Sequence, residues 1–221
     1  DLIIINNEKV YENNEGFYCE NLDLKVLPEG LSDYYQVNYI VRKSKKKQDQ
    51  KIDLKDIKIA PNIFKFIFFI LKTFKYKNCN YLLISITPYT FISFLILLFS
   101  RKKVFTYLFS SGHEEYKHIL GGWSVWIYDI MYKIVTSNSK VIVCHERLYD
   151  KEKSHLVYIS RLDNDWISDH KKPPQDKPRF LYVGRMSKEK GIFSFLKMFD
   201  KININASLSI AGNAENNKII Q

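Results

Sequence analysis

Short apolar runs alternate with stretches of helical periodicity, and this alternation constrains the fold more than any other feature. The runs "YLLISI" at Tyr81–Ile86 and "KVFTYLF" at Lys103–Phe109 are separated by a helical segment at Pro88–Ser100. Strands that alternate with helices indicate βαβ units and a parallel sheet. Several runs are apolar without alternation, as expected where helices cover both faces of a sheet. The sequence therefore predicts a doubly wound α/β fold.

The same pattern extends along the whole chain. Further strands are expected at Leu2–Ile5, Val37–Val41, Ile57–Ala60, Lys140–Cys144, His155–Ile159, Arg179–Val183 and Ser207–Ala211. Further helices are expected at Glu20–Gln36, Pro61–Lys77, Gly122–Thr136 and Gly191–Ile202, with Pro28 and Gly30 as candidate breaks in the first.

The segment "SDHKKPPQDKP", Ser168–Pro178, interrupts the alternation. Adjacent prolines flanked by charges form a stiff, solvated linker. We therefore expect a first Rossmann-like domain over residues 1–168, a linker over 169–178, and a second domain over 179–221. By size, the last segment is about a third of an ordinary domain.

Composition limits the kinds of partner and the cellular location that we expect. The formal net charge of +10 favours an anionic partner: nucleic acid, a phosphorylated ligand or an anionic membrane. A lysine-rich bias from an AT-rich genome is an alternative explanation. Cys19, Cys79 and Cys144 are too widely spaced for a disulfide framework or a zinc site, which favours a reducing, cytoplasmic location. We expect no signal peptide, and the apolar run Tyr89–Phe99 is shorter than the ~20 residues of a spanning helix.

The motif "YVGRMSKEKG", Tyr182–Gly191, follows a predicted strand, and ligands of open α/β sheets bind beyond the carboxyl ends of strands. Gly184 allows a sharp turn and leaves room for a ligand. Arg185 offers a planar fork for phosphate oxygens, and Lys190 adds a mobile charge. The following helix N-terminus also favours an anion. The motif predicts a cationic pocket of diphosphate size, although spacing alone leaves a solvated turn equally open.

The segment "FLYVGRMSKEKGIFSFLKMF" resembles the opening of the donor domain in family 4 retaining glycosyltransferases, which have the GT-B architecture of two Rossmann-like domains facing a cleft. "LSIAGNAE", Leu208–Glu215, resembles their next strand and glycine turn. The resemblance implies that Arg185 and Lys190 hold the donor's diphosphate and that Gly212 lines the nucleotide side. Ala214 stands where the family usually has a second glycine.

The amino-terminal part resembles the family mainly by position, which makes residues 1–168 the acceptor-side domain. In "ENNEGFYCEN", Gly16 stands for the family's glycine-rich loop, whose amides approach the donor phosphate. In "FSSGHEEY", His113 stands where the family places a histidine near the sugar. Its hydrogen bond to a sugar hydroxyl would orient the donor. An ordinary surface turn and a helix-capping histidine are the alternatives at these two positions.

The resemblance implies a hexosyltransferase-type enzyme that moves a sugar from a nucleotide-diphosphate sugar to an acceptor hydroxyl with retention. The acceptor is expected to be a surface polysaccharide or a lipid-linked glycan. His113, Arg185 and Lys190 would act in catalysis, with no metal and no cofactor besides the donor substrate. The family's distal glutamate pair has no counterpart before Gln221, so we expect this chain to bind a donor weakly.

Two other functions stay open. The "DND" segment has the D-x-D spacing of a metal-dependent glycosyltransferase that would use Asp163 and Asp165. A basic α/β module without enzymatic activity would instead bind nucleic acid or an anionic membrane. The absence of aromatic stacking motifs argues against nucleic acid.

The segment "PNIFKFIFFILKTFKYK" places aromatic residues at helical spacing among lysines. Such a helix lies in an anionic membrane interface, so we expect peripheral contact through Phe64–Lys77 at the inner face of the membrane. Tyr89–Phe99 is apolar nearly all round, which favours a helix packed on the sheet. Trp123 and Trp126 fit either an acceptor surface or the core.

Overall fold

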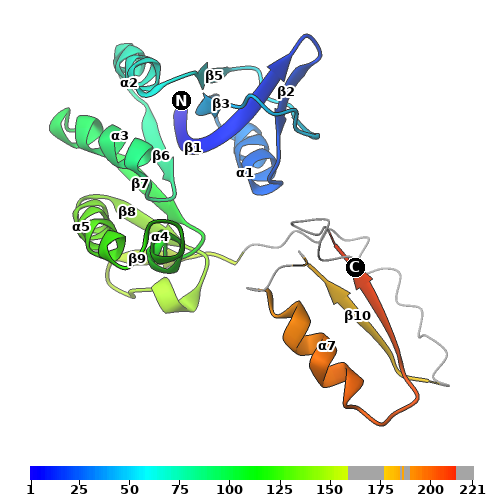
Figure 1. The fold of residues 1–221 in the computed structure, drawn as a ribbon. Helices are drawn as coiled ribbons and strands as arrows, with labels where there is room; N and C mark the ends of the chain where they lie inside the picture. The colour runs from blue at the N-terminus through cyan, green and yellow to red at the C-terminus, as the bar shows by residue number, and fades with distance from the viewer. Residues whose placement is uncertain (159–176, 185, 187–189, 213–221) are drawn as a thin grey trace. The chain divides into compact units, whose positions relative to one another are not determined.

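The computed structural model describes residues 1–158, 177–184, 186 and 190–212 (Figure 1). The chain forms two compact units, Asp1–Ser160 and Arg161–Gln221. The predicted linker, 169–178, lies almost entirely outside the described residues, so the predicted domain boundary stays a prediction.

A parallel sheet forms the centre of the first unit. Its strands run in the order β5 (Ile57–Ala60), β3 (Val37–Lys43), β1 (Leu2–Asn13), β6 (Asn80–Ile84), β7 (Val104–Leu108), β8 (Lys140–Val143) and β9 (Ser154–Leu156). The chain winds outward from β1 in one direction and then from β6 in the other. This is the doubly wound order, with its switch point between β1 and β6. The predicted α/β fold class is confirmed.

An antiparallel ribbon extends one end of this sheet. The register of β1 shifts between Ile5 and Lys9, and the strand then pairs antiparallel with β2 (Gly16–Cys19). In turn, β2 pairs with β4 (Gln50–Ile52). The sequence prediction ended the first strand at Ile5 and missed β2 and β4. β2 has four residues and β4 three, and strands this short are stable only beside a partner, so their own sequence carries little signal.

Alternate residues of β1 face opposite sides of the sheet, and helices cover both. Ile3 and Ile5 lie in one buried cluster, whereas Leu2 and Ile4 lie in another. The continuous apolar run "LIII" therefore has no polar position, because both faces are buried. Each fully buried side chain of this kind contributes about 1.5–3 kcal/mol of transfer free energy.

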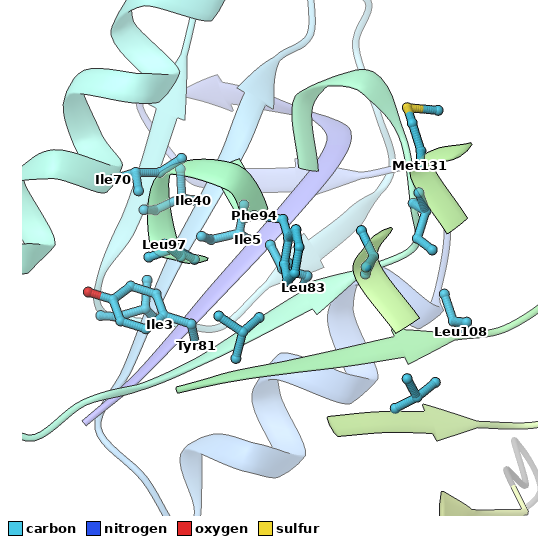
Figure 2. Close-up of a cluster of buried hydrophobic side chains, with 14 of the residues drawn as sticks. Ile3, Ile5, Ile40, Ile70, Tyr81, Leu83, Phe94, Leu97, Leu108 and Met131 are labelled. Carbon is cyan, nitrogen blue, oxygen red and sulfur yellow. The ribbon is translucent and has the colours of Figure 1, made fainter. Parts of the chain in front are cut away.

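Three helices supply the cover for the face of Ile3 and Ile5. They are α2 (Ile63–Lys72), α3 (Pro88–Phe99) and α5 (Trp123–Asn138), and they lie on the same side of the sheet in Figure 1. Phe94 and Leu97 of α3 pack among Ile3, Ile5 and Leu83 (Figure 2). On the other face, α1 (Asp23–Ser32) packs against the second cluster.

Local capping sets where two of these helices begin. The Asn62 side chain accepts a hydrogen bond from the amide of Lys65, so α2 begins at Ile63 and not at Pro61 as predicted. Thr87 and Thr90 form a reciprocal capping box at α3, with Pro88 at the first helical position. The helix predicted from Glu20 to Gln36 is shorter, and it continues through Pro28 and Gly30 without a break.

The second unit contains a parallel βαβ element. It consists of β10 (Arg179–Val183), α7 (Ile192–Asp200) and β11 (Ser207–Ala211), and the two strands pair in parallel from Arg179–Ser207 to Val183–Ala211. Phe195 of α7 stacks on Tyr182, which fixes the helix against β10. Both strands have the predicted bounds.

Replacing Gly30 with alanine is expected to stabilise the first unit by about 0.5–1 kcal/mol, because glycine in a helix loses more backbone entropy than alanine on folding. A Cβ atom at Gly30 would meet no heavy atom within 4 Å. Urea denaturation followed by tryptophan fluorescence measures the free energy of unfolding. As the matched control, Gly121→Ala should destabilise, because Gly121 has a φ of +92°. Equal effects of the two substitutions would contradict this account.

Candidate functional site

Two glycines meet at the carboxyl edge of β10 and β11. Gly184 follows β10 and donates its amide to the carbonyl oxygen of Ala211 at 3.0 Å. Gly212 follows β11, and a Cβ atom on it would lie 1.8 Å from the carbonyl oxygen of Gly184. No side chain fits in that space. Residue 212 must be glycine for the two turns to approach so closely.

Lys190 lies beside Tyr182, at the end of β10. The Tyr182 hydroxyl donates to the backbone oxygen of Lys190 at 3.2 Å. The same hydroxyl lies 3.5 Å from the position of a Cβ atom on Gly184. Tyr182 therefore touches both ends of the loop, which brings Gly184 and Lys190 together. Lys190 itself is exposed to solvent.

The loop runs directly into the N-terminus of α7. Gly191 caps this helix in the left-handed region, with a φ of +72° that favours glycine. Among the residues that the structure describes, no side chain caps the helix, and the positive end of its dipole favours an anion. The edge thus combines a helix N-terminus, a lysine and two glycine turns.

The structure brings together three of the predicted residues: Gly184, Lys190 and Gly212. Arg185 lies outside the described residues, as do Ala214 and the aspartates of the metal-dependent alternative, Asp163 and Asp165. Within the described part of the chain, no three His, Cys, Asp or Glu side chains cluster as metal ligands. The binding roles assigned to these residues stay predictions.

In the first unit, His113 begins α4 (His113–Leu120), a short helix after β7. Its Nε2 atom lies 2.6 Å from Oδ1 of Asp129, and its ring packs edge-to-face on Tyr128. An ionised carboxylate only accepts hydrogen bonds, so the neutral ring holds its proton on Nε2 and leaves Nδ1 as an acceptor. Nearby, burial and the charge of Asp150 raise the pKa of Tyr132. His113 is therefore oriented by α5 as well as by the start of α4.

Gly112, directly before His113, is required by the packing of α5. Its amide donates to the Tyr128 hydroxyl at 3.0 Å, and a Cβ atom on it would lie 2.5 Å from the Tyr128 ring. The glycine makes room for that ring, which contacts the Gly112 backbone and the His113 side chain. Sequence reasoning missed Tyr128 and Asp129, because both lie in the middle of an ordinary helical pattern.

A second set of polar residues lies near the switch point between β1 and β6. Asn7 belongs to β1, Arg42 to β3, and Ser85 follows β6. The Arg42 guanidinium donates to Oδ1 of Asn7 at 3.1 Å and lies 4.3 Å from the ring centre of Tyr89. Ser85, directly after β6, has a φ of +62°, which is unusual for a residue other than glycine. Strain of this kind gathers at functional sites. The sequence prediction placed Ser85 within a strand.

The sequence predicted that Gly16 lies in a glycine-rich loop that leads into a helix. The structure shows otherwise. Gly16 opens β2 in a hairpin and pairs with Asn13 of β1. A Cβ atom on Gly16 would lie 3.3 Å from Cε of Lys51 on β4. The local structure prediction was wrong here because the first strand continues into the ribbon. Its role toward a donor phosphate stays a prediction.

Residues 163–221 match the family Glycosyl transferases group 1. The match covers the last 59 of the 221 residues, including the carboxyl edge of β10 and β11. No curated protein matches the chain significantly. The family match supports a group 1 glycosyltransferase, and the α/β units with mostly parallel strands are consistent with a Rossmann-like GT-B fragment. For residues 163–221 the resemblance is confirmed at the level of group 1, whereas membership of family 4 and retention stay predictions.

The substitution Gly212→Ala is expected to destabilise the carboxyl edge of the second unit by about 1–3 kcal/mol, because the added methyl group must displace the backbone of Gly184. Hydrogen exchange at the amides of β10 and β11 measures this effect. Gly122→Ala serves as the control, since a Cβ atom there meets no heavy atom within 4 Å. Unchanged exchange in the Gly212 variant would show that the two turns are not in contact.

Proposed function

We propose that this chain belongs to a retaining, family 4-type hexosyltransferase, which moves a sugar from a nucleotide-diphosphate donor to an acceptor hydroxyl. The observation that supports the proposal is that the matched segment includes the residues at the carboxyl edge of β10 and β11. The segment that matches group 1 glycosyltransferases contains Gly184, Lys190 and Gly212, and these residues gather at one edge of a parallel sheet. Ligands of such sheets bind at this edge.

The chemistry of the transfer fits the charges at this edge. As the bond between sugar and diphosphate breaks, negative charge builds on the departing phosphate. Arg185, Lys190 and the α7 N-terminus stabilise that charge, and each such contact lowers the barrier by a few kcal/mol, on the order of 3. The cations take the place of a metal, and the donor sugar nucleotide is the only cofactor-like group required.

His113 contributes on the acceptor-side unit. Because Asp129 holds its Nε2 proton, Nδ1 accepts a hydrogen bond from a hydroxyl of the donor sugar and thereby orients it. No covalent nucleophile is required: the leaving phosphate itself helps to deprotonate the acceptor hydroxyl.

Isothermal calorimetry with uridine diphosphate tests the donor site. Saturable binding is expected, and Arg185→Ala and Lys190→Ala should each weaken it about tenfold, since a hydrogen bond to a charged group is worth about 1.5–3 kcal/mol. Lys197→Ala, which removes a lysine from the last turn of α7, should leave the affinity unchanged. An affinity for uridine diphosphate that Arg185→Ala leaves unchanged would contradict the assigned phosphate site.

The acceptor in this proposal is a surface polysaccharide or a lipid-linked glycan, and the enzyme works at the cytoplasmic face of the membrane. The support comes from α2. Its residues Phe66 and Ile70 are buried, whereas Phe64 is 81% exposed. The Nζ atoms of Lys65 and Lys72 lie 4.7 Å and 4.6 Å from the Phe68 ring centre. An exposed aromatic face between lysines suits an anionic interface.

Membrane attachment in this proposal is peripheral. Across the part of the chain that the structure describes, every helix is too short or too polar to cross a bilayer. Contact therefore involves the segment Phe64–Lys77 lying along the surface.

The double substitution Lys65→Gln and Lys72→Gln is expected to lower partitioning onto phosphatidylglycerol vesicles about tenfold or more, because each lysine near an anionic surface contributes about 1 kcal/mol. Vesicle sedimentation measures this. The control, Lys45→Gln with Lys47→Gln, removes the same charge from an exposed loop. Equal losses in both variants, accompanied by salt-sensitive binding to nucleic acid, would favour a basic binding module instead.

A further inference from the structure

The stretch of chain that contains α2 and α3 carries a large positive charge. No acidic residue occurs between Asp56 and Glu114. The same interval contains the cations Lys58, Lys65, Lys72, Lys75, Lys77, Arg101, Lys102 and Lys103. It includes all of α2 and α3. An anionic partner is therefore favoured for this layer.

An apolar groove continues the layer beyond α2. It lies between α3, α4 and α5, has a volume of about 480 Å³, and is lined almost wholly by carbon atoms. Its lining includes Phe91, Ile92, Leu120, Trp126, Ile127 and Ile130. Pockets of a few hundred Å³ with apolar walls are typical of small-molecule sites.

The groove is joined to α2 through α3. Tyr89 of α3 packs edge-to-face on Phe66 of α2, while Phe91 and Ile92 of the same helix line the groove. The helices α2, α3 and α5 lie side by side on one face of the sheet (Figure 1). The basic aromatic surface of α2 and the groove are therefore parts of one helix layer.

Large apolar side chains stand exposed around the groove. Trp123 and Trp126 are 66% and 68% exposed, so they belong to the surface and not to the core. On α3, Phe99 is 83% exposed, although Phe94 and Leu97 of the same helix are buried. The helix predicted to be packed on the sheet thus has an apolar outer face as well. Tryptophan is enriched where a protein meets the membrane–water interface.

We propose that the groove receives a hydrocarbon chain of a bilayer lipid, so that the protein lies on an anionic membrane through α2, α3 and α5 together. The inference rests on the membrane contact proposed above and extends it from α2 to a lipid site. A hydrocarbon chain needs no hydrogen bonds, and the walls of the groove offer almost none.

The charge of the layer also argues against a second copy of the chain as the occupant. A symmetric pair would place the same lysines of two layers, such as Lys65 and Lys72, next to each other, and like charges across an interface cost free energy. An anionic lipid surface supplies the opposite charge for α2 and an apolar chain for the groove at once.

Fluorescence quenching by brominated lipid tests the site directly. The chain has three tryptophans, so Trp166→Phe leaves Trp123 and Trp126 as the reporters. Phosphatidylglycerol vesicles with brominated acyl chains should quench this variant strongly, whereas unbrominated vesicles of the same composition should not. Absence of quenching would overturn the proposal, because both indoles lie at the groove.

Vesicle sedimentation of the full chain adds a second readout. Trp123→Ser and Trp126→Ser should each weaken binding about tenfold, the scale of one large apolar side chain withdrawn from water. Tyr34→Ser, at an 83% exposed aromatic after α1, should not weaken it. Circular dichroism confirms that each variant folds.

The outcomes separate this inference from the proposed function. Retained vesicle binding in both tryptophan variants, together with loss in the Lys65 and Lys72 variant, would overturn the groove and leave the α2 contact standing. Concentration-dependent dimerisation that the tryptophan variants abolish, without vesicle binding, would overturn it in favour of a second copy. Quenching that persists although uridine diphosphate fails to bind would support the groove and count against the transferase.

Discussion

The backbone of Gly184 lies against the backbone of Gly212 at the carboxyl edge of β10 and β11, and the proposed donor site depends on this contact. A side chain at residue 212 would push the two turns apart. With none there, the Gly184 amide reaches the carbonyl oxygen of Ala211, and the Tyr182 hydroxyl donates to the backbone oxygen of Lys190. Lys190 is followed directly by the N-terminus of α7. Because residue 212 has no side chain, Lys190 and the amides at the start of α7 lie near the edge of the sheet, where an anion can bind.

The first unit also has polar residues near the carboxyl ends of its parallel strands, but their positions are set by side-chain partners. Its strand order reverses between β1 and β6, and the residues beyond these strands are polar or strained. The positions of Arg42 and His113 are each fixed by a partner on another element, Asn7 for one and Asp129 for the other. Residues held in this way keep their orientation without a ligand, which lowers the entropic cost of binding.

The sequence was sufficient wherever local pattern and tertiary environment agree. The strands at Ile57–Ala60, Arg179–Val183 and Ser207–Ala211 have their predicted bounds, because each apolar run ends where its turn residues begin. Prediction failed where stability comes from a distant partner. The strand β4 exists because β2 lies beside it, and the need for Gly112 arises from a ring sixteen residues later.

The residues of the candidate site also fall into those that a local motif predicted and those that only tertiary packing identifies. Gly184, Lys190 and Gly212 were predicted because a compact motif contains two of them and the next strand ends before the third. Asp129 and Tyr128 have no such motif, and only the packing of α4 on α5 brings them to His113. Whether Trp123 and Trp126 are buried also depends on a neighbouring helix, which the helical period alone does not identify.

An amide NMR titration of the chain with uridine diphosphate tests the central claim most directly. The account predicts that the amides of Gly184, Lys190, Gly191 and Gly212 shift together and saturate with one affinity, while those of α2 remain in place. Shifts confined to the lysine-rich surface of the first unit, with the edge of β10 and β11 unaffected, would contradict it.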